Sequence, residues 1–243
     1  MNVALTGAAG FVGSHILTDL QRSGHEVTAF VRDDAQAAQA AAAGATPAVI
    51  DLYDTPTVAS EFGRTDGAIH TASPGDATSA NLDSAVVDAA MAAFAGTGKP
   101  VIVSSVVYGD GGGAVPGLLL GSPRDDDGNL IMLGSGRQHW STVHAADLAG
   151  FFRRALENES VSGRYIVGDG LSPTVGDLTN AAAVAPGAVP GSDDEAKSRI
   201  GDYFAEVLLL DQGTDAAKAR HDLGWRPSHP GLVDDFRSGS YRN

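Results

Sequence analysis

The sequence predicts an α/β fold, a doubly wound parallel sheet followed by a smaller, mostly helical lobe. In its first part, short runs rich in β-branched residues alternate with longer alanine-rich stretches of helical periodicity, as in repeated strand–helix–strand units. The expected strands are 2–6, 26–31, 45–50, 67–71 and 100–104. The expected helices between them are 13–23, 34–43, 55–62 and 79–96. Because each helix carries the chain back to the edge at which the previous strand began, the strands are expected to run parallel.

The second part of the chain has a different texture. From Tyr108 to Arg137 glycine, proline and acidic residues dominate, which predicts loops. Periodicity then returns, with expected helices at 144–157, 174–184, 194–206 and 215–223 and one expected strand at 164–167. We therefore predict a core domain of residues 1–110 and a lobe of residues 111–243, from which residues 142–168 return to the core.

The composition excludes several classes of protein. Sixteen basic against 30 acidic residues give a net charge of −14 at pH 7, which disfavours nucleic acid as a partner. The absence of cysteine excludes disulfides, thiolate nucleophiles and cysteine-ligated metals, and no histidine spacing indicates another metal site. The apolar runs are too short to span a membrane, and the N-terminus has no basic signal-peptide region. A cytoplasmic protein with a small-molecule substrate and no membrane partner is expected.

A glycine-rich loop follows the first expected strand and opens the first expected helix. It reads Gly7-Ala8-Ala9-Gly10-Phe11-Val12-Gly13. Gly7 allows a tight turn, Gly10 lets the backbone approach a diphosphate, and Gly13 lets the helix pack closely on the sheet. The N–H groups at the start of the helix, assisted by the helix dipole, suit an anion. The loop therefore predicts a dinucleotide site.

The spacing of this loop, with Thr6 before it and Phe11 inside it, resembles the short-chain dehydrogenase/reductase superfamily. Further segments resemble its extended branch, which includes NAD-dependent epimerases and dehydratases and dihydroflavonol-reductase-like enzymes. These are Asp51-Leu52, His70-Thr71-Ala72-Ser73, Val143-His144-Ala145-Ala146-Asp147-Leu148-Ala149 and Leu223-Gly224-Trp225-Arg226-Pro227. The resemblance implies a Rossmann-type sheet and hydride transfer between a nicotinamide cofactor and a small carbonyl or alcohol.

The resemblance also implies individual cofactor contacts. Gly7, Gly10, Phe11, Val12 and Gly13 would hold the diphosphate. Asp51 would accept a hydrogen bond from the adenine amino group while Leu52 packs on the ring, although Asp51 is also a candidate helix N-cap. Ala72 and Ser73 would pass beside the riboses, and His70 is interpreted as a packed residue at a strand end.

Arg32 ends the second expected strand, where this fold distinguishes the two nicotinamide cofactors. An arginine there pairs with a 2′-phosphate, whereas a carboxylate holds a 2′-hydroxyl. Asp33 follows directly and weakens the distinction, and Arg32 could instead be a solvated surface charge. We predict NADP as the cofactor in preference to NAD.

Reduction in this superfamily depends on a Tyr-x-x-x-Lys pair, in which the lysine lies on the same helix face and lowers the pKa of the tyrosine. The chain lacks this motif: the residues four places after its first four tyrosines are Thr57, Gly112, Asp169 and Val207, and Tyr241 is too close to the last residue. Tyr108 is a poor substitute because glycines surround it and no lysine follows at the right offset.

Two registers describe the segment where the motif is expected. In one, Ser104-Ser105 through Tyr108-Gly109 follows the fifth strand. In the other, which we prefer, Val107 through Gly113 follows the sixth strand, so a helix and part of a strand, about 30 residues, are absent between Ser105 and Val106. Ser104 and Ser105 remain as catalytic candidates that would hydrogen-bond a substrate carbonyl, or as strand-end serines that bond the backbone.

The lobe supplies candidate substrate contacts. Trp140 and Tyr203 would line an apolar pocket, and Arg137 would grip an anionic or oxygen-rich substrate or lie at its rim. His144 is interpreted as structural. Two functions follow. The first is an NAD(P)-dependent oxidoreductase or epimerase-type enzyme, and the alternative is a catalytically silent NAD(P)-binding sensor or partner-binding protein, because the Tyr/Lys pair is absent. Assembly as a homodimer stays open.

Overall fold

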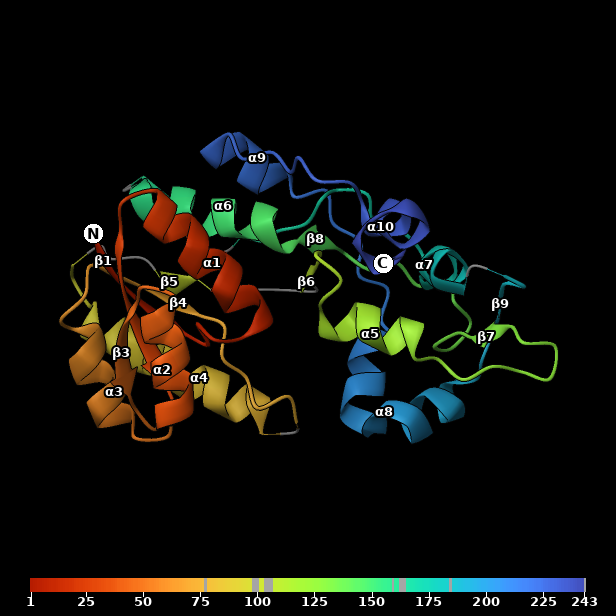
Figure 1. Cartoon of the computed structure of the whole chain (residues 1–243), viewed down its shortest axis with the longest axis horizontal. Coiled ribbons are helices and arrows are strands. Elements are labelled where there is room, and N and C mark those ends of the chain that lie inside the picture. Colours follow the sequence, from red (N-terminus) through yellow and green to blue (C-terminus); the bar gives the residue numbers. More distant parts are fainter. Residues whose placement is uncertain are drawn as a thin grey trace. The chain divides into compact units, whose positions relative to one another are not determined.

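The computed structural model describes residues 1–76, 78–97, 101–102, 107–158, 160–161, 165–183 and 185–242. The chain forms two compact units (Figure 1). The first unit comprises Met1–Ser104 and Leu148–Gly163, and the second comprises Ser105–Asp147 and Arg164–Asn243. The chain thus returns to its first unit once, through most of the helix α6 (Ala145–Glu157).

The first unit is built on a parallel sheet of order β3-β2-β1-β4-β5. Its strands are β1 (Asn2–Thr6), β2 (Glu26–Val31), β3 (Thr46–Val49), β4 (Gly67–His70) and β5 (Val101–Ile102). The helices α1 (Phe11–Arg22), α2 (Asp34–Ala42), α3 (Thr55–Phe62) and α4 (Ser79–Ala93) alternate with the strands. The predicted α/β fold with a doubly wound parallel sheet is confirmed.

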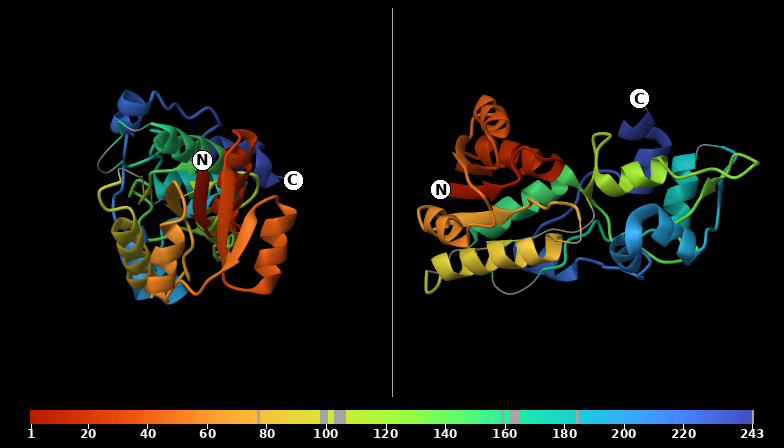
Figure 2. Two further views of the ribbon diagram at one scale, coloured as in Figure 1. Left: turned by 90° about the vertical axis from the view of Figure 1, so that its left-hand side faces the viewer. Right: turned by 90° about the horizontal axis from the view of Figure 1, so that it is seen from below.

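Aromatic packing joins α3 and α4 to the sheet of the first unit. Phe30 of β2 stacks on Phe62 of α3 with ring centroids 5.0 Å apart, and Phe62 contacts Phe94 at 6.2 Å. All three side chains are buried, and burial of each stabilises the unit by about 1.5–3 kcal/mol. The two helices lie side by side in both views of Figure 2. This packing holds the sheet that positions the glycine loop.

A charged cluster attaches the returning helix α6 to α1 and to the start of β2. The Arg153 guanidinium contacts Asp19 at 3.0 Å and Glu157 at 2.9 Å, and Nε2 of His25 lies 3.1 Å from Glu157. Burial alone would raise the pKa of Glu157, but hydrogen bonds from His25 and Arg153 outweigh it and lower this pKa. The cluster thus links α6 to elements of the first unit that are distant from it in sequence.

The second unit contains two small parallel pairs and several helices. β6 (Val107–Tyr108) pairs with β8 (Val143–His144), and β7 (Leu130–Ile131) pairs with β9 (Ala188–Val189). The helices are α5 (Ala114–Leu120), α7 (Val175–Ala183), α8 (Asp193–Leu208, kinked at Gly201), α9 (Ala217–Leu223) and α10 (Leu232–Ser238), followed by a 3-10 turn at Ser240–Arg242. Trp140 and Tyr108 are fully buried in the core of this unit. It is mostly helical, as predicted.

Three local expectations were wrong. The expected strand at 164–167 is absent from its described residues 165–167, so β-favouring residue types alone do not form a strand there. The stretch 108–137, expected to be loops, contains α5 and β7. Helix α1 begins at Phe11 rather than Gly13, because Gly10 in an extended conformation already serves as its N-cap. In the described part of the chain, no helix has the length and apolarity required to cross a bilayer.

Candidate functional site

The glycine loop has the compact geometry that its spacing predicts. Gly7 has a φ of 73°, and its carbonyl accepts a 2.8 Å hydrogen bond from the Gly10 N–H. A Cβ at Gly13 would lie 2.0 Å from the Gly7 oxygen, which no side chain can tolerate. The three glycines therefore allow the loop to fold back on the first turn of α1.

The N-terminus of α1 is free of negative charge. Its N-cap is Gly10, no side chain caps it, and its first turn holds no acidic residue. Within the described residues, the N–H groups of Phe11, Val12 and Gly13 find no protein acceptor. By contrast, an aspartate caps α2 and another caps α3. In a chain of net charge −14, this makes the start of α1 suitable for an anion.

Arg32 lies at the end of β2 with its side chain 81% exposed. Its neighbour Asp33 caps α2: the carboxylate accepts a 2.8 Å hydrogen bond from the Gln36 N–H and lies 3.4 Å from the Arg32 guanidinium. Gln36 in turn accepts from the Arg32 N–H. Since helix capping engages Asp33, the arginine is the more available of the two for a ligand.

Asp51 follows β3 and is exposed. Its Oδ1 accepts a 2.9 Å hydrogen bond from the Tyr53 N–H, while the N-cap of α3 is Asp54, which accepts hydrogen bonds from the N–H and hydroxyl of Thr57. The alternative role of Asp51 as a helix cap is thus taken by Asp54. Leu52 is half-buried against the core of the first unit.

The segment after β4 packs directly on the glycine loop. A Cβ at Gly7 would lie 2.8 Å from the Ala72 nitrogen, and the Thr71 hydroxyl donates to the Thr6 carbonyl at 2.8 Å. Ala72 is half-buried and Ser73 is exposed. The structure therefore brings together the loop and the segment that the resemblance assigns to the cofactor.

Ser104 and Ser105 lie outside the described residues, so their catalytic role stays a prediction. The strands on either side belong to different sheets: β5 pairs with β4, whereas β6 pairs with β8. Two parallel neighbouring strands of one sheet need a crossover connection of a dozen or more residues between them. The connection from β5 to β6 is shorter than this, which agrees with their pairing in different sheets.

Tyr108 cannot serve as an exposed proton donor in this arrangement. Its side chain is fully buried, and its hydroxyl donates to the Pro230 carbonyl at 2.7 Å. Burial, followed by the nearby Asp169, Asp147 and Asp235 charges, raises the pKa of Tyr108 well above its usual range. The structure therefore gives Tyr108 a packing role in the second unit.

His144 takes part in a packed cluster of the second unit. Its ring stacks on that of His229 at 4.0 Å, and its Nδ1 accepts from the Ala146 N–H. The buried Asp147 carboxylate accepts hydrogen bonds from the N–H groups of Ser228 and His229 and lies 3.0 Å from the His229 Nδ1. The cluster fixes the segment around residue 228, which agrees with a structural role for His144.

The second unit contains a further glycine-rich loop, residues 109–113 between β6 and α5. The Tyr241 hydroxyl accepts from the Gly109 N–H at 2.9 Å and donates to the Gly112 carbonyl. The Ser240 hydroxyl accepts from the Gly111 N–H at 2.8 Å. The hydroxyl groups of Tyr241 and Ser240 thus provide hydrogen-bond partners for the backbone of this loop.

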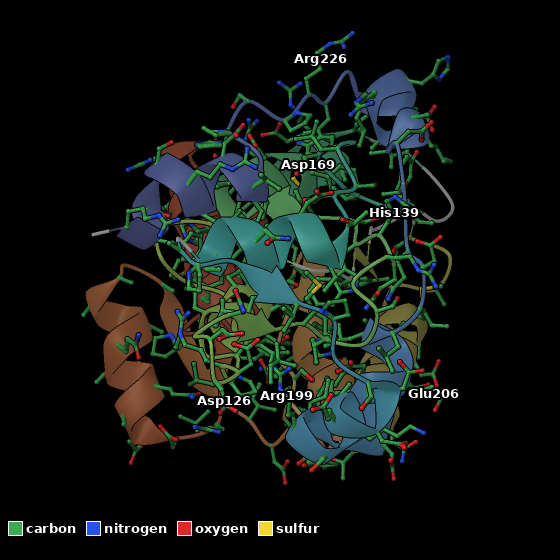
Figure 3. The ribbon with its side chains drawn as sticks, turned by 90° about the vertical axis from the view of Figure 1, so that its right-hand side faces the viewer. Asp126, His139, Asp169, Arg199, Glu206 and Arg226 are labelled. Carbon is green, nitrogen blue, oxygen red and sulfur yellow. The ribbon has the colours of Figure 1, made fainter. Side chains whose placement is uncertain are left out.

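The candidate substrate residues occupy different surroundings. Trp140 is a core residue whose indole N–H donates to the Leu208 carbonyl, whereas Arg137 and Tyr203 are exposed. Sequence reasoning missed Arg199 of α8, labelled in Figure 3. Its guanidinium donates to the Ser122 hydroxyl at 2.8 Å and to the Ile131 carbonyl at 3.1 Å. Arg199 therefore connects α8 to the rest of the second unit. The substrate role of Arg137, Trp140 and Tyr203 stays a prediction.

The first part of the chain is similar to a family of known proteins. The family model described as NAD(P)H-binding matches residues 7–122. The uncharacterized protein C2A9.02 of Schizosaccharomyces pombe is 27% identical, over 99% of this chain and 100% of its own length. The uncharacterized protein YLL056C of Saccharomyces cerevisiae is 24% identical, over 98% of each chain. Residues 7–122 are thus similar to an NAD(P)H-binding family, which supports the nicotinamide cofactor that the sequence predicts.

Solved structures of epimerases share the fold. A nucleoside-diphosphate-sugar epimerase from Pseudomonas aeruginosa has a TM-score of 0.71 at 18% identity, over 99% of this chain and 97% of the other. The UDP-glucose 4-epimerase of Thermotoga maritima has 0.69 at 16%, over 99% and 98%. A human epimerase family protein solved with NADPH has 0.64 at 20%, over all of both chains. The chain therefore shares the fold of these epimerases, as the sequence predicts.

The alignments with the two yeast proteins are longer than this chain. They extend over 297 and 300 positions and cover 99% and 98% of this chain, which has only 243 residues. Both relatives therefore contain internal positions that this chain lacks.

Proposed function

We propose that the NAD(P)H-binding domain of this chain holds NADP(H) and serves a reaction of the oxidoreductase or epimerase type on a small carbonyl or alcohol. The observation that carries the cofactor part of the proposal is the start of α1. Three N–H groups there find no acceptor among the described residues, no acid lies in the first turn, and the loop before it is closed by glycine.

The binding roles follow from the local geometry. The N–H groups of Phe11 and Val12 would donate to the diphosphate, and Gly10 would leave room for its approach. Asp51, which is exposed and does not cap a helix, would accept from the adenine amino group beside Leu52. The backbone of Ala72 and Ser73 would pass along the riboses.

The preference for NADP rests on Arg32. Its guanidinium is exposed at the end of β2, and the adjacent carboxylate is already engaged in capping α2. A 2′-phosphate offers the guanidinium a charge-assisted, bidentate partner, whereas a 2′-hydroxyl needs a free carboxylate that Asp33 does not supply. We therefore propose that NADPH binds more tightly than NADH.

The chemical step would use few groups of this chain. The nicotinamide ring supplies or accepts a hydride when the cofactor is bound. Ser104 or Ser105 would donate a hydrogen bond to the substrate oxygen and stabilise its developing negative charge. Arg137 and Tyr203, both exposed, would contact the substrate on the lobe of residues 111–243, and Trp140 is buried in the core of the second unit.

One observation favours a second candidate, a catalytically silent NAD(P)-binding sensor. The sequence holds no Tyr-x-x-x-Lys pair, and the Tyr108 hydroxyl is buried and bonded to Pro230. Without a positioned acid, reduction of a carbonyl would lose the roughly 10²–10⁴-fold that proton transfer contributes. Binding would persist while turnover would not.

Two measurements test and separate these functions. NADPH and NADH are titrated by the change in NADPH or NADH fluorescence, and the absorbance of bound NADPH is then followed with a panel of aldehydes, ketones and nucleotide sugars. Saturable binding with substrate-dependent oxidation supports the enzyme. Saturable binding supports the sensor when there is no oxidation above background and no nucleotide sugar is converted to its epimer. The second condition is needed because an epimerase returns the hydride to its substrate and causes no net oxidation of the cofactor. If neither nucleotide binds or raises the melting temperature, the proposal is wrong, because a ligand of the native state must stabilise it.

A further inference from the structure

We infer that Thr6, His70 and Asp83 form a hydrogen-bond relay that positions the Thr71–Ala72 backbone against the glycine loop and thereby sets the affinity of the first unit for the dinucleotide. The inference rests on the proposed function, because it concerns the same site. All three act as positioning residues: they hold the backbone that would contact the cofactor.

The relay starts at the end of β1. Thr6 is fully buried and directly precedes Gly7. Its Oγ1 lies 3.2 Å from the nitrogens of both Thr71 and Ala72, and each N–H points at it. The same oxygen lies 2.7 Å from the Nδ1 of His70, whose Nε2 lies 3.2 Å from the Asp83 Oδ1 on α4.

Counting hydrogens assigns the direction of every bond. A hydroxyl oxygen has two lone pairs and one hydrogen, and the N–H groups of Thr71 and Ala72 occupy both lone pairs. The Thr6 hydrogen must then go to the His70 Nδ1, which must be unprotonated. The proton of neutral His70 therefore sits on Nε2, where it donates to the Asp83 carboxylate. Asp83 thus selects the tautomer that orients the Thr6 hydroxyl.

The two backbone N–H groups that donate to Thr6 lie next to the glycine loop of residues 7–13. The position of a Cβ at Gly7 lies 2.8 Å from the Ala72 nitrogen and 2.9 Å from the Thr71 carbonyl carbon. A shift of this segment by even a fraction of an ångström would change the space available to Gly7. Since a bound ligand needs its contacts in place beforehand, loosening the segment lowers affinity.

The charge state of His70 suits this role. Its side chain is 3% exposed, and burial lowers its pKa, against the smaller opposing effect of Asp83, the carboxylate that faces it from α4. The neutral ring is the form the relay requires, because a protonated Nδ1 would face an oxygen whose lone pairs are both used. Burial therefore favours the neutral ring, and the contact with Asp83 favours the proton on Nε2.

The main test compares two substitutions at one position. Thr6→Val keeps the shape and removes the hydroxyl, so the N–H groups of Thr71 and Ala72 lose their acceptor; we expect the Kd for NADPH to rise about tenfold. Thr6→Ser restores the hydroxyl, and its Kd is expected to stay within about twofold of wild type. Rescue by serine is the readout that a purely apolar packing role would not produce.

A milder pair guards against failure of Thr6→Val to fold. Asp83→Ala removes the group that selects the tautomer from a half-exposed site on α4, and we expect about a threefold rise in the Kd for NADPH. Asp88→Ala, on the same helix but exposed, is the matched control and should bind as wild type. Nitrogen NMR of wild-type His70 should show Nδ1 unprotonated and Nε2 protonated at neutral pH.

The outcomes separate this inference from the proposed function. Wild-type binding of NADPH together with an unchanged Kd in folded Thr6→Val, or a protonated Nδ1 in wild type, overturns the relay and leaves the cofactor proposal intact. Absence of NADPH binding in wild type overturns both. A rise in Kd for Thr6→Val and Asp83→Ala, with Thr6→Ser and Asp88→Ala near wild type, supports the relay.

Discussion

Two glycine-rich loops of this chain are similar in construction, but their N–H groups have different surroundings. Each follows a strand and opens a helix: residues 7–13 lead from β1 into α1, and residues 109–113 lead from β6 into α5. Both use positive φ angles, 73° at Gly7 and 127°, 72° and 105° at Gly109, Gly111 and Gly113. On glycine content alone, either could be taken for an anion-binding turn.

Their hydrogen bonds distinguish them. In the first loop, the N–H groups at the start of α1 have no acceptor within the described residues. In the second, Tyr241 and Ser240 occupy the N–H groups of Gly109 and Gly111, and the buried Asp235 accepts from Ser240. A glycine spacing therefore indicates a ligand site only where the protein leaves the donors open and keeps acids away.

The largest expected effect comes from closing the first loop. In Gly13→Val, the new Cβ would lie 2.0 Å from the Gly7 oxygen, so the loop must move away from the helix. We expect NADPH binding to weaken by about 100-fold or more, as several charge-assisted hydrogen bonds of about 1.5–3 kcal/mol are lost. Titration of NADPH fluorescence measures it.

Gly150→Ala on α6 is the matched control. A Cβ there meets nothing within 4 Å, and the residue is helical. It should leave the Kd unchanged and stabilise the protein by about 0.5–1 kcal/mol. Equal Kd values for Gly13→Val and wild type would show that α1 does not hold the nucleotide.

The second loop should respond in stability rather than in nucleotide affinity. Tyr241→Phe leaves the Gly109 N–H and the Gly112 carbonyl without their partner, so we expect a loss of about 1–3 kcal/mol in the free energy of unfolding. The Kd for NADPH should not change. Urea unfolding measures this, with Tyr203→Phe on the exposed surface of α8 as control. An unfolding free energy equal to that of wild type would show that the hydroxyl does not hold the loop.

The first loop was predictable from the sequence and the second was not, for a physical reason. Gly7, Gly10 and Gly13 act within one strand–helix turn, so spacing, strand and helix are all local. The partners of the second loop arrive from about 130 positions away, since Gly109 bonds Tyr241 at a separation of 132 residues. No local sequence pattern predicts a partner so distant in sequence. In the same way, the local composition of residues 108–137 predicts loops and misses α5 and β7.

The candidate site shows the same division. Residue type and position suffice to suggest Asp33 and Asp54 as helix N-caps. Because Asp54 caps α3, Asp51 does not. The relay from Thr6 to His70 depends on parallel pairing of β1 with β4, which sets Thr6 beside His70. That neighbour relation is a property of sheet order, which the alternation of strands and helices does not by itself specify.

A more moderate effect is expected at Arg32. Arg32→Ala removes the exposed guanidinium, so the Kd for NADPH should rise about tenfold, while that for NADH, which has no 2′-phosphate, should change less than about twofold. Arg64→Ala, an exposed arginine paired with Glu61, is the control. If NADPH and NADH lose affinity equally, Arg32 acts as a general positive charge and not as the group that selects the phosphate.

The smallest effect concerns pH and sharpens the contrast at the second loop, because the His144 ring lies against Gly109. Burial, then the nearby His229, lowers the pKa of His144, while Asp110, Asp147 and Asp235 oppose this. A histidine whose folded pKa is lowered contributes stability that is present above its unfolded pKa of about 6.5 and is lost as the pH falls through the folded value.

Urea unfolding between about pH 8 and pH 5 tests this linkage. Wild type should lose stability below about pH 6.5, and His144→Asn, which stays neutral, should lose less over the same interval. Some dependence will remain in the variant, because burial lowers the pKa of His70 in the first unit in the same direction. The two proteins should run parallel above about pH 7.5, where both histidines are neutral. Parallel curves at every pH would mean that His144 titrates alike in the folded and unfolded chain, and the second loop would then lack the pH sensitivity that its contact with this ring implies.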